Sequence, residues 1–208
     1  MIGPETTTLW GTTAACDRAP PSRTTNKTTA DVRMAFSIRQ SCTISRPVKQ
    51  LLILRHAKSH WGNPSLDDWE RTLNERGERD APRVGTLLRE HSLVPDVIVT
   101  SDAVRARTTA QAAATAAGCA REIVLEPSLY LAPPDAILDI VCGLPDDAAI
   151  AMIVGHNPGL EDFVEQLSGE PQGLVTAALV LIEIQIDRWR DLDFSIRATI
   201  INSWRPRH

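Results

Sequence analysis

Short apolar runs recur along the chain and predict the strands of a sheet. The first run, residues 51–54, has four consecutive aliphatic side chains, as expected of a strand buried on both faces. Similar runs occupy residues 97–99, 122–125 and 149–154. None approaches the length of about 20 apolar residues that a membrane-spanning helix needs. The pattern therefore predicts several short buried strands.

Helical periodicity follows the first strand, after a polar loop. Asn74 suits the N-cap position of this helix, and apolar residues continue at helical spacing to residue 91. Pro82 lies inside the pattern and lacks the backbone N–H that a helix interior uses. We therefore expect either a kinked helix or one whose regular part starts near residue 80.

Two further helices are expected to begin directly after strands. The alanine-rich segment 105–118 forms one of them, with Ser101 or Asp102 available as its cap. The other follows the strand at 149–154, where Asn157 suits the N-cap and Pro158 the first helical position. Each of these strands thus leads into the N-terminus of a helix.

The remaining segments complete an alternating pattern of strands and helices. Residues 135–141 are predicted to be helical, whereas 177–186 and 194–201 read as two strands of a hairpin joined near 187–191. Alternating strands and helices that finish in a hairpin predict an α/β fold. We expect a three-layer α/β/α sandwich with a mostly parallel mixed sheet.

The first 48 residues differ from the rest of the chain. They are rich in Thr, Ser and Pro and poor in aliphatic residues, so they cannot build a core of their own. We expect a disordered extension, or a natural start at Met34 that makes residues 1–33 superfluous. A basic, hydroxyl-rich leader can also be a transit peptide. The folded domain is expected over residues 49–208.

Composition and charge narrow the class of protein. The formal net charge of the 208 residues is −4, which gives no support to a nucleic-acid partner or an anionic membrane surface. The cysteines form no CxxC pair and are expected to be free thiols in a reducing cytoplasm. These four cysteines are Cys16, Cys42, Cys119 and Cys142.

Reactive side chains follow three of the predicted strands. Arg55 and His56 end the first strand, and His156 ends the strand at 149–154. Arg105 lies in the first turn of the helix after the strand at 97–99. Arginine forks and helix N-termini bind phosphate, and a neutral imidazole can accept a phosphoryl group. If these strands are neighbours, the cluster is a phosphate site.

Four sequence motifs give this cluster a family resemblance. The run Arg55-His56-Ala57-Lys58-Ser59 resembles the RHG or RHA signature of the histidine phosphatase superfamily, whose fold is phosphoglycerate-mutase-like. Residues 101–109 resemble its second motif, S-x-x-x-R-A-x-x-T, and 155–158 resemble its strand-terminal G/S-H. Residues 71–77 are similar to the R-x-L-x-x-x-G stretch of SixA-type phosphohistidine phosphatases.

The resemblance implies a mechanism and a set of site residues. His56 would attack phosphorus and become phosphorylated, and water would then hydrolyse the phosphohistidine. Arg55, Arg105 and His156 would hold the phosphoryl oxygens, with Arg71 and Ser59 as further phosphate-binding residues. From its sequence context Arg71 is either a pocket residue or an ion-pair partner. The resemblance implies no metal ion and no other cofactor.

One departure from the family bears on the substrate. Larger members carry a glutamate general acid on a loop where this chain has Ser128, and Glu126 nearby could substitute. An imidazole leaves more easily than an alkoxide, so a missing acid favours a phosphohistidine-bearing protein as substrate. The alternatives are a broad small-molecule phosphomonoesterase or mutase, or a non-catalytic phosphoprotein-binding module.

Overall fold

A mixed sheet forms the centre of the domain. The computed structural model describes residues 48–61 and 67–206, and six strands of this part of the chain pair in the order β3-β2-β4-β1-β5-β6. The strands are β1 (Lys49–Arg55), β2 (Val97–Thr100), β3 (Ile123–Leu125), β4 (Ile150–Gly155), β5 (Leu179–Ile184) and β6 (Thr199–Trp204).

The directions of the strands confirm the mostly parallel mixed sheet. β3, β2, β4 and β1 are mutually parallel, whereas β5 runs antiparallel to β1 and β6 antiparallel to β5. β1 and β4 pair in a register that sets Arg55 opposite Gly155. The next residues along the two strands, His56 and His156, therefore leave the same edge of the sheet side by side.

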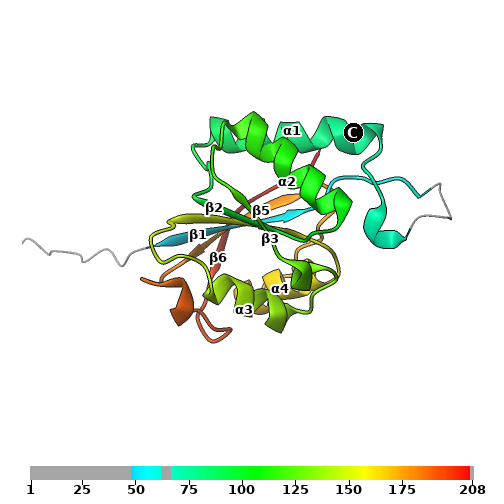
Figure 1. Cartoon of the computed structure of the whole chain (residues 1–208). Coiled ribbons are helices and arrows are strands. Elements are labelled where there is room, and N and C mark those ends of the chain that lie inside the picture. Colours follow the sequence, from blue (N-terminus) through cyan, green and yellow to red (C-terminus); the bar gives the residue numbers. More distant parts are fainter. Residues whose placement is uncertain (1–47, 62–66, 207–208) are drawn as a thin grey trace, which may run out of the picture. The chain divides into compact units, whose positions relative to one another are not determined.

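Two helices cover each face of the sheet, as Figure 1 shows. The helices are α1 (Glu75–Glu90), α2 (Val104–Ala117), α3 (Pro134–Cys142) and α4 (Gly159–Ser168). α1 and α2 pack on one face, and α3 and α4 on the other, so the expected three-layer α/β/α sandwich is confirmed. The helix expected at 135–141 is thus present as α3.

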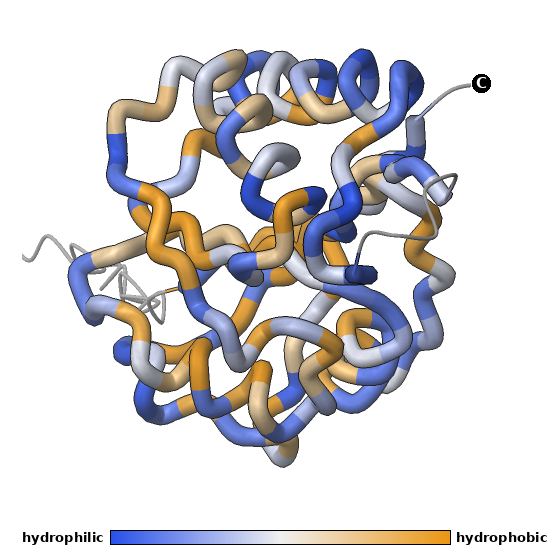
Figure 2. The backbone as a smooth tube through the Cα atoms, turned by 45° about the vertical axis from the view of Figure 1, so that its right-hand side comes forward, coloured by the Kyte–Doolittle hydropathy of each residue, from blue (hydrophilic) through white to orange (hydrophobic). Residues whose placement is uncertain are grey.

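Alternate residues of β1 build two separate cores. Leu52 and Leu54 pack into the cluster beneath α1 and α2, whereas Leu51 and Ile53 pack into the cluster beneath α3 and α4. All four side chains are fully buried, and burial of each contributes about 1.5–3 kcal/mol. Figure 2 shows hydrophobic stretches of the chain running through the middle of the domain. This two-sided burial explains the unbroken apolar run.

The expectation that the first helix becomes regular only near residue 80 is wrong. α1 begins at Glu75, and Oδ1 of Asn74 accepts a hydrogen bond from the N–H of Gly77 at 3.0 Å, as its predicted N-cap role requires. The N–H of Asn74 also donates to the carbonyl of Lys58 at 3.0 Å. These bonds fix the first turn, so the helix is regular from Glu75, and it continues through Pro82 to Glu90.

The predicted caps of α2 and α4 are also wrong. The N-cap residues are Ala103 and Pro158, and neither makes a side-chain capping bond. The amide of Asn157 instead donates from Nδ2 to the carbonyl of Leu174 at 3.0 Å. Oδ1 of Asp102 accepts from Nε1 of Trp69, also at 3.0 Å. The side chains of Asp102 and Asn157, which the local sequence predicts as caps, instead form hydrogen bonds with residues distant in the chain.

The C-terminal hairpin is present with a longer connection than predicted. β5 and β6 pair antiparallel, but β6 begins at Thr199, after a connection that includes a 3-10 helix at Trp189–Asp191. Trp189 is fully buried in the core beneath α3 and α4. The indole of this residue holds the connection against the domain, which shortens the predicted second strand at its start.

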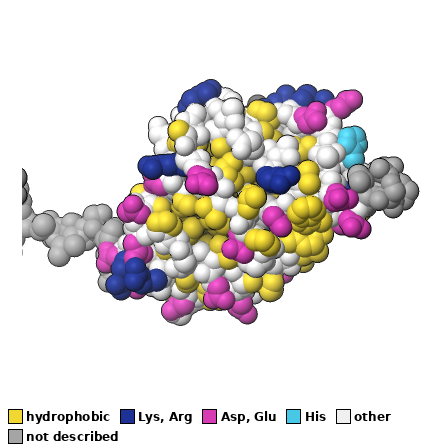
Figure 3. Space-filling model, in the orientation of Figure 1, with side chains coloured by type: hydrophobic (Ala, Val, Ile, Leu, Met, Phe, Trp, Pro, Cys, Tyr) yellow, Lys and Arg dark blue, Asp and Glu magenta, His cyan; other side chains and the backbone are white. Residues whose placement is uncertain are grey.

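The edge strand β3 is partly uncovered. Val124 and Leu125 expose 47% and 45% of their surface, and Figure 3 shows hydrophobic side chains gathered across the middle of this face. Among the residues that the structure describes, Cys119 and Cys142 form no disulfide. In the part of the chain that the structure describes, no helix is long and apolar enough to cross a membrane. The predicted extension over residues 1–48 lies outside the described residues except for Val48.

Candidate active site

The ring of His56 is held in one tautomer by the backbone. The imidazole lies directly after β1, is 8% exposed, and has Nδ1 2.8 Å from the carbonyl oxygen of Ala57. A carbonyl oxygen only accepts hydrogen bonds, so Nδ1 carries the proton and the lone pair of the neutral ring lies on Nε2. Nε of Arg105 donates to this Nε2 at 3.4 Å. The unprotonated nitrogen thus faces a guanidinium.

Arg105 is buried and tied to the loop after β1. Its side chain comes from the first turn of α2 and is only 4% exposed. Oγ1 of Thr109 donates to the carbonyl of Arg105 at 2.6 Å and accepts from the N–H of Ala57 at 2.9 Å. This hydroxyl connects α2 with the residue that follows His56. The helix and the candidate nucleophile are thereby positioned together.

His156 lies beside His56 with its ring oriented by Ser101. The two ring centroids are 5.0 Å apart, and Nε2 of His156 lies 3.0 Å from Oγ of Ser101. This Oγ accepts from the N–H of Ala103 at 3.3 Å, and its own proton has no other acceptor among the described residues, so the hydroxyl can donate to Nε2. In that arrangement the neutral ring of His156 carries its proton on Nδ1.

Three buried polar atoms around the two histidines have no hydrogen-bond partner among the described residues. They are Nε of Arg55, Nδ1 of His156 and Oδ1 of Asn157. Nη1 of Arg55 is held by the carbonyl of Leu174 at 2.6 Å, so its guanidinium is anchored at one end only. Buried polar atoms without partners are costly, and two of these three can donate to an anion.

A cavity of about 420 Å³ brings the predicted site residues together, a size that suits a small ligand. All six residues expected to contact phosphate line it, together with residues that the sequence patterns did not indicate. The lining consists of Arg55, His56, Lys58, Ser59, Trp61, Asp68, Arg71, Arg105, Tyr130, Leu131, His156, Asn157 and Thr176.

Arg71 is both a cavity residue and an ion-pair partner, the two readings left open by the sequence. Its Nη2 donates to Oγ of Ser59 at 2.8 Å, and its Nη1 lies 2.6 Å from Oδ1 of Asp68. The guanidinium also stacks 3.7 Å from the centroid of the Trp61 ring. Arg71 and Ser59 therefore form one wall of the cavity, with the indole on the outside.

Asp68 and Tyr130 are site residues that the sequence patterns missed. Oδ2 of Asp68 accepts from the hydroxyl of Tyr130 at 2.7 Å and from Nη2 of Arg105 at 2.8 Å. The only sequence signal for Asp68 is its place in the polar loop, three residues before Arg71. Tyr130, the single tyrosine of the chain, belongs to none of the four motifs.

The site favours neutral histidines and bound anions. Burial lowers the pKa of His56 to about 4, with the charge of Arg105 acting in the same direction. Burial, with the nearby His56 and Arg105, lowers the pKa of His156 to about 3. Partial burial opposes the ionisation of Asp68, but hydrogen bonds from Tyr130 and Arg71 outweigh it and hold the pKa of this carboxyl well below its ordinary value.

Glu126 does not reach the cavity that contains His56. Its Oε1 accepts from the N–H of Ser128 at 3.0 Å and from the hydroxyl of Ser128 at 2.7 Å, and these bonds lower its pKa. Both residues line a separate cavity beside α3. The idea that Glu126 takes the place of a general acid is therefore not supported by its position, because its carboxylate is held elsewhere.

No group of three or more His, Cys, Asp or Glu side chains that could hold a metal ion occurs within residues 48–61 and 67–206. The donors that converge on the cavity of His56 are guanidinium and imidazole groups instead. Such groups suit an anion with several oxygens, and arginine in particular can bind phosphate through two parallel hydrogen bonds.

Comparison with known proteins places the chain in a family. Residues 51–130 match the family model of the histidine phosphatase superfamily (branch 1). An uncharacterized chloroplastic protein of Arabidopsis thaliana is 33% identical over 184 residues, which cover 82% of this chain and 83% of that relative. The chain belongs to the histidine phosphatase superfamily.

Within the superfamily, two further similarities bear on the type of member. The crystal structure of a protein from Agrobacterium tumefaciens, provisionally named phosphohistidine phosphatase SixA, is 28% identical with a TM-score of 0.66 and covers 76% of this chain and 98% of its own. A 2,3-bisphosphoglycerate-dependent phosphoglycerate mutase of Streptomyces avermitilis is 46% identical over 66 residues. That match spans 31% of this chain and only 26% of the mutase.

Proposed function

We propose that this chain is a phosphatase that hydrolyses phosphohistidine in proteins through a phosphoryl intermediate on Nε2 of His56. The observation that carries the proposal is the bond from Nδ1 of His56 to the carbonyl of Ala57, 2.8 Å long. It leaves the lone pair on Nε2, beside Arg105 and the ring of His156. A neutral imidazole with a fixed lone pair is a suitable phosphoryl acceptor.

In the first step, Nε2 of His56 attacks phosphorus opposite the leaving imidazole of the substrate. The new bond joins Nε2 to phosphorus, while the P–N bond of the substrate breaks and its electron pair returns to the leaving nitrogen. Nε of Arg55, Nδ1 of His156 and the guanidinium of Arg105 then donate to the phosphoryl oxygens. These donors offset the charge that spreads over the oxygens in the transition state.

In the second step, water attacks the phosphorus of the phosphorylated His56. The Nε2–P bond breaks and its electron pair returns to Nε2. The water oxygen becomes the fourth oxygen of the released phosphate, which keeps one of the two water protons, while the other passes to a second phosphate oxygen or to the solvent. The bond to Ala57 keeps Nδ1 protonated throughout, so the ring returns to its starting tautomer. We further propose that neither step needs a metal ion, because the guanidinium groups of Arg55 and Arg105 supply the positive charge.

The carboxylates near the site support phosphohistidine rather than an alkyl phosphate as substrate. Asp68 is the carboxylate in the cavity, and its lowered pKa makes it a poor proton donor. A phosphorylated imidazole that is protonated on its free nitrogen leaves as neutral imidazole and needs no enzyme acid. Histidine has a reference pKa of about 6.5, so a sizeable share of such a substrate is in this form near neutral pH.

Phosphate release from a phosphohistidine-bearing protein and from p-nitrophenyl phosphate tests the proposal. Both substrates are assayed with excess chelator, using the wild type, His56→Ala and Glu126→Gln. We expect release from the phosphohistidine protein by the wild type and by Glu126→Gln, unaffected by chelator, and no turnover by His56→Ala. Near-wild-type activity of His56→Ala would refute the assignment of the nucleophile.

The same assay separates the alternative functions. A preference for p-nitrophenyl phosphate that Glu126→Gln abolishes would favour a small-molecule phosphomonoesterase or a mutase. The relative from Streptomyces avermitilis is named as a mutase. Tight binding of phosphate without release from either substrate would favour a phosphoprotein-binding module. Loss of activity in chelator, restored by an added cation, would contradict the metal-independent reaction.

We also propose that the protein acts in the cytoplasm. Cys119 and Cys142 are unpaired within the described part of the chain, which suits a reducing compartment. The relative from Arabidopsis thaliana is described as chloroplastic, so an organelle is the alternative. Imaging of the full chain with a fluorescent protein at its C-terminus tests this, since diffuse signal supports the cytoplasm and organellar signal supports a transit peptide in residues 1–48.

A further inference from the structure

A second and larger cavity, of about 780 Å³, adjoins the site of His56. The N–H of Ala177, which lines this second cavity, donates to the carbonyls of Arg55 and His56 at 3.2 Å, and the neighbouring Thr176 lines the first cavity. The residues that line the second cavity are Arg76, Arg79, Asp80, Arg83, Val84, Leu87, Ala177, Leu179, Trp204, Arg205 and Pro206.

The charges around this second cavity are predominantly positive. Asp80 is 5% exposed and lies 3.3 Å from Nε of Arg76 and 3.1 Å from Nη1 of Arg83, so its charge is already neutralised. Arg79 and Arg205 are exposed and make no ion pair with any other described residue. In a chain of net charge −4, this is a local concentration of positive charge.

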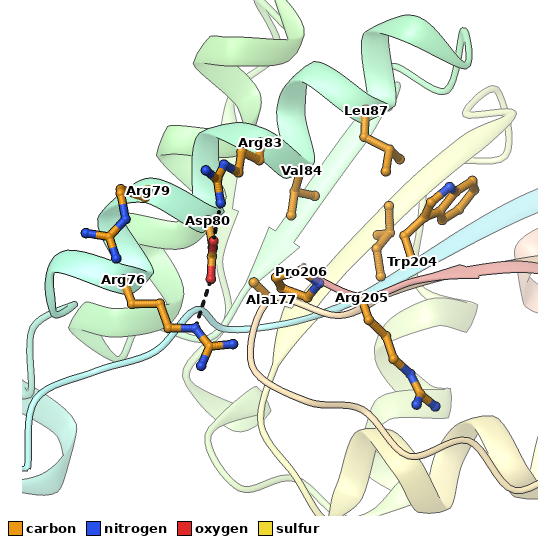
Figure 4. Close-up of a pocket in the computed structure, with 11 residues that line it drawn as sticks. Arg76, Arg79, Asp80, Arg83, Val84, Leu87, Ala177, Trp204, Arg205 and Pro206 are labelled. Carbon is orange, nitrogen blue, oxygen red and sulfur yellow. Dashed lines mark hydrogen bonds and ion pairs between the residues drawn. The ribbon is translucent and has the colours of Figure 1, made fainter. Parts of the chain in front are cut away.

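The opposite side of the second cavity is apolar. Figure 4 shows Val84, Leu87 and Trp204 on one side, with the arginines of α1 toward the other. Leu87 and Trp204 are half-buried, so part of each side chain remains available for contact. Protein interfaces are enriched in arginine and in aromatic residues of this kind. The surface therefore suits a partner that carries acidic and apolar side chains close together.

The arrangement favours a polypeptide segment over a small molecule. Small-ligand sites direct a few buried polar groups at one point. Here the basic groups are spread over an exposed rim, since the side chain of Arg83 is 65% exposed. The buried polar atoms without partners among the described residues lie at the first cavity instead. A segment with several side chains can reach dispersed charges, as a compact ligand cannot.

We propose that the second cavity docks an acidic segment, containing apolar side chains, of the same protein that presents its phosphohistidine to His56. This inference rests on the proposed function and extends it to substrate recognition. The two cavities share a wall, because Gly77 at the start of α1 packs directly on the backbone of Lys58. Lys58 lines the first cavity and Arg76 the second, so one partner can occupy both.

Matched phosphohistidine peptides test the docking surface. One set carries glutamate and leucine residues beyond spacers of increasing length, and a second set carries glutamine and serine in their place. We expect the wild type to show a higher kcat/KM for the acidic peptides at one spacer length. Arg79→Glu with Arg205→Glu should lower that kcat/KM by about tenfold, since reversal of two exposed charges typically has an effect of this size.

Controls separate docking from catalysis. Free phosphohistidine should be hydrolysed at the wild-type rate by the double variant, because neither Arg79 nor Arg205 lines the cavity of His56. Arg197→Glu, an exposed arginine in the connection between β5 and β6, should change neither rate. Equal kcat/KM for the acidic and neutral peptides, or an equal loss on free phosphohistidine, would overturn the proposal.

Direct binding makes the docking surface testable without turnover. Fluorescence anisotropy of the unphosphorylated acidic peptide should show binding to His56→Ala that weakens with rising salt and with Arg79→Glu and Arg205→Glu. Absence of that binding would overturn the docking surface even if phosphohistidine is hydrolysed. If the wild type binds the acidic peptide but does not hydrolyse phosphohistidine, the proposed function is overturned, whereas the docking surface for an acidic segment still holds.

Discussion

The carboxylate of Asp68 lies 2.8 Å from Nη2 of Arg105, and Nε of the same guanidinium lies 3.4 Å from Nε2 of His56. One arginine thus bridges an internal anion and the candidate nucleophile. Asp68 also pairs with Arg71 and accepts from Tyr130. An incoming phosphoryl group needs the donors that this carboxylate occupies, so Asp68 and substrate compete for Arg105.

Asp68→Asn should strengthen the binding of inorganic phosphate as a competitive inhibitor. Removal of the negative charge lowers the competition for Arg105 and Arg71, and a gain of about tenfold in affinity is expected for one screened charge. The inhibition constant for phosphate measures the change. Asp67→Asn is the matched control, because the neighbouring Asp67 does not line the cavity. Weaker phosphate binding in Asp68→Asn would contradict this competition.

Arg105→Lys should lower kcat by about 10²-fold, a typical loss for an oriented charge stabiliser. Lysine keeps the charge but cannot reproduce the planar fork that contacts His56 and Asp68 together. Single-turnover formation of phosphoenzyme measures the chemical step. Arg107→Lys, an exposed position on the same helix, should leave the rate unchanged. Wild-type phosphoenzyme formation by Arg105→Lys would remove this guanidinium from the reaction.

His56 should stay neutral well below the pH at which an ordinary histidine becomes charged. Its pKa is lowered to about 4, so the nucleophile remains available as the pH falls through about 6.5 and is lost only near 4. As the pH falls from about 6.5 to about 4, the unfolded chain binds this proton before the folded chain does. The shift in pKa therefore makes the free energy of unfolding decrease as the pH falls through this range. Titration of the ring by NMR in the free protein measures the pKa, and a midpoint near 6.5 would contradict it.

Ser101→Ala should allow His156 to adopt both neutral tautomers. Without the hydroxyl 3.0 Å from Nε2, the proton of the neutral ring is no longer directed to Nδ1. We expect kcat/KM to fall by about tenfold or more, by analogy with the loss seen when a metal-ligating histidine loses the partner that orients its ring. Nitrogen NMR shifts of His156 report the tautomer directly. Ser203→Ala on β6 is the control, and an unchanged His156 spectrum in Ser101→Ala would refute the orienting role.

Gly77→Ala should destabilise the fold. A Cβ at this position would lie 2.1 Å from the carbonyl oxygen of Lys58, a contact with backbone that no side-chain rotation relieves. We expect a loss of about 1–3 kcal/mol in the free energy of unfolding, measured by urea denaturation. At Gly173 an added Cβ meets no atom within 4 Å, so Gly173→Ala should have little effect. Equal stability of the two variants would contradict the close approach.

The convergence of the candidate site could be predicted from sequence because it depends on strand ends. Arg55 with His56, and Gly155 with His156, each follow an apolar run, and parallel neighbours bring such residues to one edge. The fold class followed from the same alternation of strands and helices. Both predictions rest on short-range patterns: an apolar run that ends in a reactive residue, and the alternation of such runs with helical segments.

The remaining features depend on contacts between segments distant in the chain. Asp68 meets Arg105 across 37 positions, and Asn157 bonds to Leu174 instead of capping the next helix. Ser101 likewise gives its hydroxyl to His156, 55 positions away. A local propensity cannot anticipate such competition, because both outcomes satisfy the same polar group. The missed cap positions and the missed Asp68 therefore have one physical origin.

The carbonyl of Leu174 receives hydrogen bonds from both Arg55 and Asn157. Since this acceptor belongs to the main chain, its presence does not depend on which side chain stands at position 174. The carboxylate of Glu161, in turn, accepts from the N–H of the same residue at 2.6 Å. The segment between α4 and β5 can therefore diverge in sequence among relatives while the guanidinium of Arg55 keeps its anchor. Changes in the side chains of this segment can then alter which substrates the cavity admits.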